Sequence, residues 1–195
     1  MTEILDLPQL TFILGGARSG KSTLAERLAA GCGTEVLYCA TAEILDSEMK
    51  RRVALHRSRR PSIWETVEAP FEVASKIADQ LEKRSYSAIL LDCLSILTSN
   101  ALLKMEEHIS EAEAWKRFYT MEFFPLLTLI QKNPKIHWFI VSNEVGMGVV
   151  PAYELGRQYR DLLGRANQTT AAAAGTFYFM AAGVPLKMKP MDGCQ

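Results

Sequence analysis

The chain has 195 residues, of which 48% are hydrophobic and 23% are charged. This is an ordinary globular composition, and the length suits one domain with a substantial core. Lysine plus arginine and aspartate plus glutamate both total 22, so the formal net charge is zero. We therefore expect no nucleic-acid partner and no general attraction to anionic membranes, and any anion site must be local.

The four cysteines, Cys32, Cys39, Cys93 and Cys194, are scattered, without a CxxC pair or clustered histidines. This spacing argues against a zinc site and favours reduced thiols in a cytoplasmic protein. The N-terminus carries acidic residues where a signal peptide needs basic ones, and the apolar runs are of strand length. We expect a cytoplasmic protein without stable membrane insertion, folded as a single domain over residues 1–195 with residues 1–9 as an N-terminal extension.

A short apolar run at 10–14 leads into a glycine-rich segment and then into a helical pattern at 21–30, which Gly31 ends. The segment fits G-x-x-x-x-G-K-[ST] at every fixed position: Gly15-Gly16-Ala17-Arg18-Ser19-Gly20-Lys21-Ser22. Glycines let the backbone wrap a polyphosphate, so that N–H groups and the helix N-terminus point at the anion. Lys21 would place a positive charge at the β- and γ-phosphates, and the Ser22 hydroxyl would bind Mg²⁺. A chance Gly-Lys-Ser in a strand-to-helix turn is the alternative, but the flanking strand and helix favour a phosphate-binding loop.

A second strand is predicted at 35–40, followed by Thr41-Ala42-Glu43. Polar residues just past the carboxyl end of a parallel strand lie beside the ligand crevice of such a sheet. Thr41 and Glu43 are therefore either nucleotide contacts or plain turn residues.

The segment 46–60 is predicted as a helix that Pro61 ends. It is rich in arginine, and Arg52, His56 and Arg60 share one face at i, i+4, i+8 spacing. A solvated basic face is one interpretation. In the other, neighbouring guanidinium groups keep His56 neutral near pH 7, so that its ring attacks the α-phosphorus of a nucleotide whose phosphates the arginines hold.

A strand-like run at 63–70 and a helix at 71–84 come next, followed by a buried strand at 87–93 that ends in Asp92. A carboxylate at this place matches the acidic motif that binds Mg²⁺ in phosphate-loop enzymes. A long amphipathic helix is predicted at 110–132, with a possible break near Pro125. Two histidines, His108 and His137, have no charged residues around them and are interpreted as structural.

A further strand at 136–141 runs into Ser142-Asn143-Glu144 and a loop with two glycines, which suggests closure over a ligand. The helix after it carries a polar stripe from 157 to 168. This stripe is either a salt-bridged exposed face or, because of Gly164, a place where a ligand or another backbone approaches. Two short strands at 176–181 and 184–188, joined by a turn at Gly183, are predicted to be antiparallel at a sheet edge.

Several segments together resemble the bifunctional adenosylcobinamide kinase / adenosylcobinamide-phosphate guanylyltransferase family of adenosylcobalamin biosynthesis. The resemblance covers the chain from Phe12 to about Lys189. It includes the phosphate loop, Tyr-Cys-Ala-Thr-Ala at 38–42, the H-x-x-x-R-P pattern at 56–61 and the W-x-T-x-E pattern at 64–68. Ser-Asn-Glu-Val-Gly at 142–146 and Gly-Arg-Ala-Asn-Gln at 164–168 complete it.

The resemblance implies an α/β fold of the P-loop NTPase, RecA-like type, and a homotrimer. It also implies two reactions: ATP or GTP phosphorylates adenosylcobinamide, and GMP is then transferred from GTP to the phosphate through a histidine intermediate, which maps to His56. Lys21 is the other catalytic residue, and Ser22 and Asp92 are the Mg²⁺ ligands. The nucleotide contacts implied are Gly15, Gly16, Ala17, Arg18, Ser19, Gly20, Lys21, Ser22, Thr41, Ala42, Glu43, Arg57, Ser58, Arg59, Arg60, Glu68 and Asp92.

Three other classes share parts of this pattern. A RecA-like motor or nucleic-acid-binding ATPase would share the fold, but the chain lacks an interleaved basic and aromatic patch. A regulatory GTPase would carry an Asn-Lys-x-Asp segment, which does not occur in the sequence. A monofunctional small-molecule kinase is the nearest alternative, and it would need no nucleophilic histidine.

Overall fold

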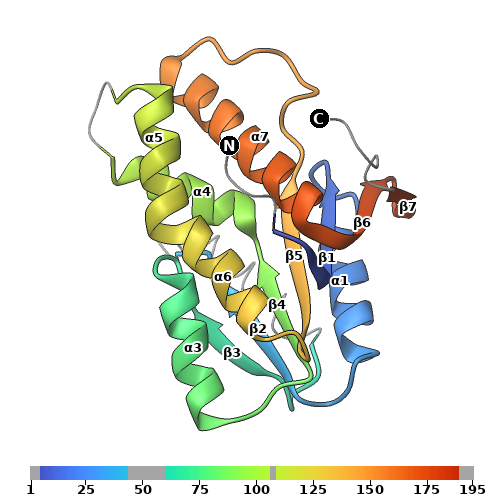
Figure 1. Ribbon diagram of the computed structural model, residues 1–195. Coiled ribbons are helices and arrows are strands. Elements are labelled where there is room, and N and C mark those ends of the chain that lie inside the picture. Colours follow the sequence, from blue (N-terminus) through green and yellow to red (C-terminus); the bar gives the residue numbers. More distant parts are fainter. Residues whose placement is uncertain (1–4, 44–59, 106–108, 189–195) are drawn as a thin grey trace.

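The computed structural model describes residues 5–43, 60–105 and 109–188. Within these residues, seven strands form one sheet in the order β3-β2-β4-β5-β1-β6-β7 (Figure 1). All neighbouring strands are parallel except β6 and β7, which confirms the predicted α/β sheet with a short antiparallel C-terminal edge. The strands are β1 (Leu7–Gly15), β2 (Val36–Ala40), β3 (Glu65–Glu68), β4 (Ala88–Asp92), β5 (His137–Asn143), β6 (Ala174–Ala181) and β7 (Val184–Met188).

Helices cover both faces of the sheet, with α1 on one face and the remaining helices on the other (Figure 1). Alternation along β1 explains this division, because successive side chains of a strand point to opposite faces. Ile13 packs in one core cluster with Leu24 of α1, whereas Phe12 and Leu14 belong to the larger cluster on the opposite face. The helical segments are α1 (Lys21–Ala30), α3 (Val73–Lys83), α4 (Leu94–Leu103), α5 (Glu111–Phe118), the π-helical η1 (Tyr119–Phe123), α6 (Phe124–Lys132) and α7 (Glu154–Ala173).

The first strand begins at Leu7, so residues 7–9 belong to the sheet and not to an N-terminal extension. Leu7 is fully buried and pairs with Ala174 of β6. The pairing shifts register between Leu7 and Thr11, where Pro8 lacks the N–H that a regular ladder needs. Gly175 lies against this irregular stretch: a Cβ there would meet the Pro8 carbonyl oxygen at 2.4 Å.

The long helix predicted at 110–132 is present as α5, η1 and α6 in direct succession. The π-helical turns precede Pro125, which lies in the first turn of α6. Proline cannot donate to the preceding turn and crowds its carbonyl, so local widening of the helix absorbs it without a break. Within η1, the buried carboxylate of Glu122 accepts hydrogen bonds from the N–H groups of Glu72 and Val73 at the start of α3.

Helix α4 has no counterpart among the predicted elements. Its residues are apolar around most of the helix, so they show no amphipathic stripe, and they follow the apolar strand β4 after a single residue. A helix without an apolar stripe at helical spacing cannot be recognised by periodicity. The helix predicted at 46–60 lies outside the described residues. None of the helices in the described part of the chain has the length and apolar character that a bilayer crossing requires.

Candidate active site

The glycine-rich segment forms a loop between the carboxyl end of β1 and the first turn of α1. Gly15 packs so closely against β6 that a Cβ would lie 2.4 Å from the Met180 carbonyl oxygen. Gly20, which precedes α1, has φ of +94°, a conformation that glycine adopts without strain. The hairpin turn between β6 and β7 supports the loop from outside, because the Gly183 N–H donates to the Ser19 carbonyl at 3.0 Å.

Lys21 is folded back over this loop. Its side chain is buried, and Nζ donates a hydrogen bond to the Gly16 carbonyl at 2.6 Å. Burial lowers the pKa of Lys21 below its ordinary value, whereas the nearby Cys93 and Asp92 side chains act in the opposite direction. The ammonium group is therefore held inside the loop that the motif predicts to enclose a polyphosphate.

The hydroxyl of Ser19 gives a second sign of a polar ligand. Ser19 is buried, and its Oγ has no hydrogen-bond partner among the described residues. A buried hydroxyl without a partner costs free energy, which a ligand oxygen would recover. The loop thus presents an ammonium group, an unsatisfied hydroxyl and the N-terminus of α1 in one place, and these are donors suited to phosphate oxygens.

The carboxyl ends of β2, β3 and β4 lie next to one another, and Asp92 of the predicted acidic motif ends β4. In the sheet register, Ala40 of β2 lies opposite Asp92 of β4 on one side and Glu68 of β3 on the other. The side chain of Asp92 is not free to rotate, because Tyr38 donates its phenolic hydrogen to Asp92 Oδ2 at 2.8 Å. Burial, and then the neighbouring charge of Asp92, raise the pKa of Tyr38, so the phenol stays a donor.

Thr41 holds the end of β4 in place. Its Oγ1 donates to the Cys93 carbonyl and accepts from the Cys93 N–H, both at 2.8 Å. Asn100 of α4 donates to the Thr41 carbonyl at 2.8 Å and to the Pro70 carbonyl at 3.1 Å. The Thr41 side chain is thus occupied by the backbone around Asp92 and fixes that carboxylate indirectly.

Arg60 is the one residue of the predicted arginine cluster that the structure describes. Its guanidinium group lies over the ring of Tyr38, with Cζ 3.4 Å from the ring centroid, and its Nε is 3.9 Å from Glu26 Oε1. The side chain is 6% exposed. Arg60 therefore connects the end of the basic segment to the same tyrosine that orients Asp92.

Two substitutions separate the roles of Tyr38. We expect Tyr38→Phe to lower the free energy of unfolding by about 1.5 kcal/mol, because it removes a buried hydrogen bond to a carboxylate. Tyr38→Leu should cost about 1 kcal/mol more, since it also removes the aromatic face under Arg60. Urea denaturation of both variants measures the two steps, and a Tyr38→Phe protein as stable as the native one would contradict the first.

The predicted site residues divide into three groups. The phosphate loop from Gly15 to Ser22 and Asp92 lie together, as the influence of Asp92 on Lys21 indicates. Thr41, Ala42 and Glu43 follow β2, and Glu68 ends the edge strand β3, which β2, β4 and β5 separate from β1. His56, Arg57, Ser58 and Arg59 lie outside the described residues.

The donors present suit Mg²⁺. The described residues contain no group of three or more histidine, cysteine, aspartate or glutamate side chains that could hold a metal. Mg²⁺ at a phosphate loop is usually bound through one or two protein oxygens, with phosphates and water as the other ligands. Ser22 in the first turn of α1 and the carboxylate of Asp92 supply oxygens of this kind.

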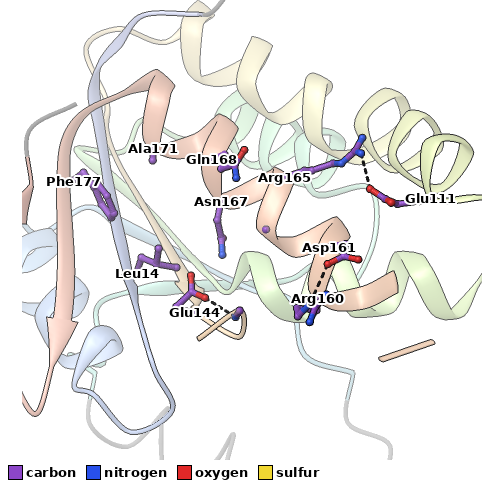
Figure 2. Close-up of a pocket in the computed structure, with 12 residues that line it drawn as sticks. Leu14, Glu111, Glu144, Arg160, Asp161, Arg165, Asn167, Gln168, Ala171 and Phe177 are labelled. Carbon is purple, nitrogen blue, oxygen red and sulfur yellow. Dashed lines mark hydrogen bonds and ion pairs between the residues drawn. The ribbon is translucent and has the colours of Figure 1, made fainter. Parts of the chain in front are cut away.

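A separate pocket of about 570 Å³ opens beside α7 (Figure 2). The predicted polar stripe of α7 lines it, together with Glu144 from the end of β5, and salt bridges link Arg160 to Asp161 and Arg165 to Glu111. The salt bridges agree with the first interpretation of the stripe, and the approach of a ligand to the cavity that the same residues border stays a prediction.

Sequence reasoning missed the residues that orient the site. Tyr38 occurs in a segment quoted for the resemblance, but no pattern in the sequence shows that the polar atoms of Tyr38 and Asn100 meet Asp92 and Thr41. Ser142 and Asn167 likewise meet across 25 positions, with the Ser142 hydroxyl donating to Asn167 Oδ1 at 2.7 Å. The sequence marked Ser142 as a polar residue at the end of a buried strand and Asn167 as part of a polar helix stripe, but it did not show that the two side chains meet.

The family model described as cobinamide kinase / cobinamide phosphate guanyltransferase (CobU) matches residues 11–188. The bifunctional adenosylcobalamin biosynthesis protein CobP of Pseudomonas aeruginosa is 41% identical over 177 residues, which cover 91% of this chain and 95% of that protein. The corresponding CobU protein of Salmonella typhimurium is 38% identical, over 92% of this chain and 99% of that protein. Among solved structures, an ATPase of a bacterial type III secretion system overlaps with 90% of this chain and 52% of its own, at 13% identity and a TM-score of 0.49.

Proposed function

The chain belongs to the cobinamide kinase / cobinamide phosphate guanyltransferase family, and from this premise we propose that it catalyses both reactions on adenosylcobinamide. In the first, the hydroxyl of the corrinoid attacks the γ-phosphorus of ATP or GTP, the nucleoside diphosphate leaves and the hydroxyl proton is released. In the second, GTP supplies GMP to the resulting phosphate, and pyrophosphate leaves. The observation that carries the proposal is the buried Lys21 ammonium inside a phosphate loop that also holds an unsatisfied Ser19 hydroxyl.

The chain's own groups account for the kinase step. Loop N–H groups and the N-terminus of α1 bind and align the phosphates, and Lys21 exchanges its hydrogen bond to Gly16 for one to a phosphate oxygen. A charge held in this buried place stabilises the negative charge of the transferring group. Mg²⁺, bound by Ser22 and Asp92, would add further positive charge at the phosphates.

For guanylyl transfer we assign the nucleophile to His56. The imidazole nitrogen attacks the α-phosphorus, a phosphorus–nitrogen bond forms and pyrophosphate leaves; the corrinoid phosphate oxygen then takes the guanylyl group and restores the ring. Arg60 supports this assignment, since it anchors the end of the His56 segment over Tyr38, beside Asp92. Arg57, Ser58, Arg59, Thr41, Ala42, Glu43 and Glu68 complete the proposed nucleotide contacts.

A labelling experiment tests the two-reaction proposal. We expect the native protein to take up label covalently from α-labelled GTP with Mg²⁺, through a bond that is stable to base and labile to acid, as a phosphoramidate is. Cobinamide phosphate should discharge the label into a corrinoid product. Protein that takes up no label from α-labelled GTP would contradict the transferase half, and label that cobinamide phosphate does not discharge would contradict its role as an intermediate.

We also propose that the chain acts as one nucleotide-binding domain in a cytoplasmic homotrimer, without a nucleic-acid partner. The single continuous sheet of the described residues supports one domain, and the zero net charge supports the absence of a nucleic-acid partner. Exposed apolar side chains on the loop before α7, among them Met147 and Val149, are compatible with a subunit contact.

A further inference from the structure

The pocket beside α7 touches the same strand end as the phosphate loop but lies on the other face of the sheet. Leu14, in its wall, directly precedes Gly15 and packs in the core cluster opposite α1. Glu144, also in its wall, donates its N–H to the Gly15 carbonyl at 3.0 Å. A molecule in this pocket would therefore have one end beside the first residue of the phosphate loop.

The electrostatics of the pocket disfavour a second nucleotide. Its charged lining consists of two arginines and three carboxylates, and each arginine is paired: Arg160 with Asp161 at 3.0 Å and Arg165 with Glu111 at 2.6 Å. The carboxylate of Glu144, which accepts only a backbone N–H in the described residues, is left as the excess negative charge. An anionic triphosphate would be repelled, whereas a neutral or cationic ligand would not.

The remaining lining is amphipathic. Leu14, Ala171 and Phe177 give an apolar floor, and the exposed amide of Gln168 stands at its edge (Figure 2). A corrinoid matches these features: its ring has broad apolar faces, its rim carries primary amides, and its cobalt–corrin core is cationic. Side-chain amides pair well with ligand amides, because each supplies both donors and an acceptor.

We infer that this pocket is the acceptor subsite, which binds one edge of the corrin ring with its amide arms and directs the aminopropanol hydroxyl past Glu144 toward the phosphate loop. The inference rests on the proposed function, since it names where that reaction's acceptor is held. A whole corrinoid is larger than about 570 Å³, so the rest of the ring lies outside the pocket mouth. Nucleotide and acceptor then approach the end of β1 from its two faces.

Gly164 offers a direct test. It lies within α7 on the pocket wall, and a Cβ added there would meet no atom within 4 Å. Gly164→Leu should therefore fold while filling the pocket, and Gly164→Ala is the matched control that adds one methyl group and no bulk beyond it. Gln168→Leu is a second variant, which removes the amide from an exposed position of the same helix without filling the cavity.

We expect Gly164→Leu to weaken cobinamide binding, measured by calorimetry, and to raise the KM for cobinamide, each at least tenfold. Gln168→Leu should raise the same KM several-fold, and Gly164→Ala should leave it unchanged. Guanylylation by α-labelled GTP should be the same in all three variants and the native protein.

Folded Gly164→Leu that binds cobinamide as the native protein does would overturn the inference, whether or not its oligomeric state has changed. If the native protein takes up label and the variants bind cobinamide as the native protein does, the subsite alone is refuted. If the native protein neither takes up label nor phosphorylates cobinamide, the proposed function is refuted.

Discussion

Lys21→Ala is expected to reduce phosphoryl transfer to cobinamide by about three orders of magnitude in kcat. The substitution removes a charge that is buried within the phosphate loop and close to Asp92, where little water is available to replace it. The fold should survive, because Lys21 lies in the first turn of α1 and alanine is a strong helix former. A coupled assay of nucleoside diphosphate release gives the rate, and circular dichroism gives the fold.

The matched control for this variant is Lys132→Ala. Lys132 ends α6 and is exposed, so its loss changes the net charge equally without touching the loop. Its kinase rate should equal that of the native protein. A Lys21→Ala protein with native kinase activity would show that the loop does not hold the transferring phosphate.

The second large effect concerns the transferase half-reaction. We expect His56→Ala to abolish covalent labelling by α-labelled GTP and formation of the guanylylated corrinoid, while kinase activity stays measurable. The reason is that the phosphorus–nitrogen bond needs an imidazole, whereas γ-phosphoryl transfer to the acceptor hydroxyl does not. Denaturing gel electrophoresis with α-labelled GTP, alongside chromatography of the corrinoid products, follows both activities in one preparation.

His137→Ala is the control histidine. It is exposed at the first residue of β5, at the end of that strand away from the Asn143–Glu144 segment. Its labelling should match that of the native protein. Label that is retained after His56→Ala but lost after His137→Ala would show that His56 is not the nucleophile.

The sequence predicted the parts of the fold whose patterns are local. In the β1–loop–α1 unit, Gly15, Gly20 and Gly31 mark the end of the strand and the two ends of the helix. The strand that ends in Asp92 is a clear apolar run followed by a carboxylate. Helix α4 escaped prediction because burial on nearly all sides removes the amphipathic signal, and the start of β1 was misplaced because Leu7 is held by β6, which lies far along the chain.

Within the candidate site, sequence motifs point to Lys21 and Asp92 as the residues expected to bear chemistry, but not to the residues that orient them. Lys21 and Asp92 belong to motifs whose spacing reflects phosphate chemistry. Tyr38 acts through a hydrogen bond to Asp92 that spans 54 positions, and the sequence gives no measure of such a distance in space. Gly164 gave the sequence one sign of the α7 pocket, but the walls of this pocket come from β1, α5, α7, β6 and the loop after β5, which only the folded chain brings together.

The support of the phosphate loop by the C-terminal hairpin bears on how the protein matures during synthesis. Gly15 is packed against Met180, and Ser19 accepts a hydrogen bond from Gly183, so the loop is held by residues that are translated long after it. A ribosome-bound chain that has not yet released this hairpin carries the whole motif but lacks its brace. Nucleotide affinity should therefore arise only after β6 and β7 have been translated and have joined the sheet.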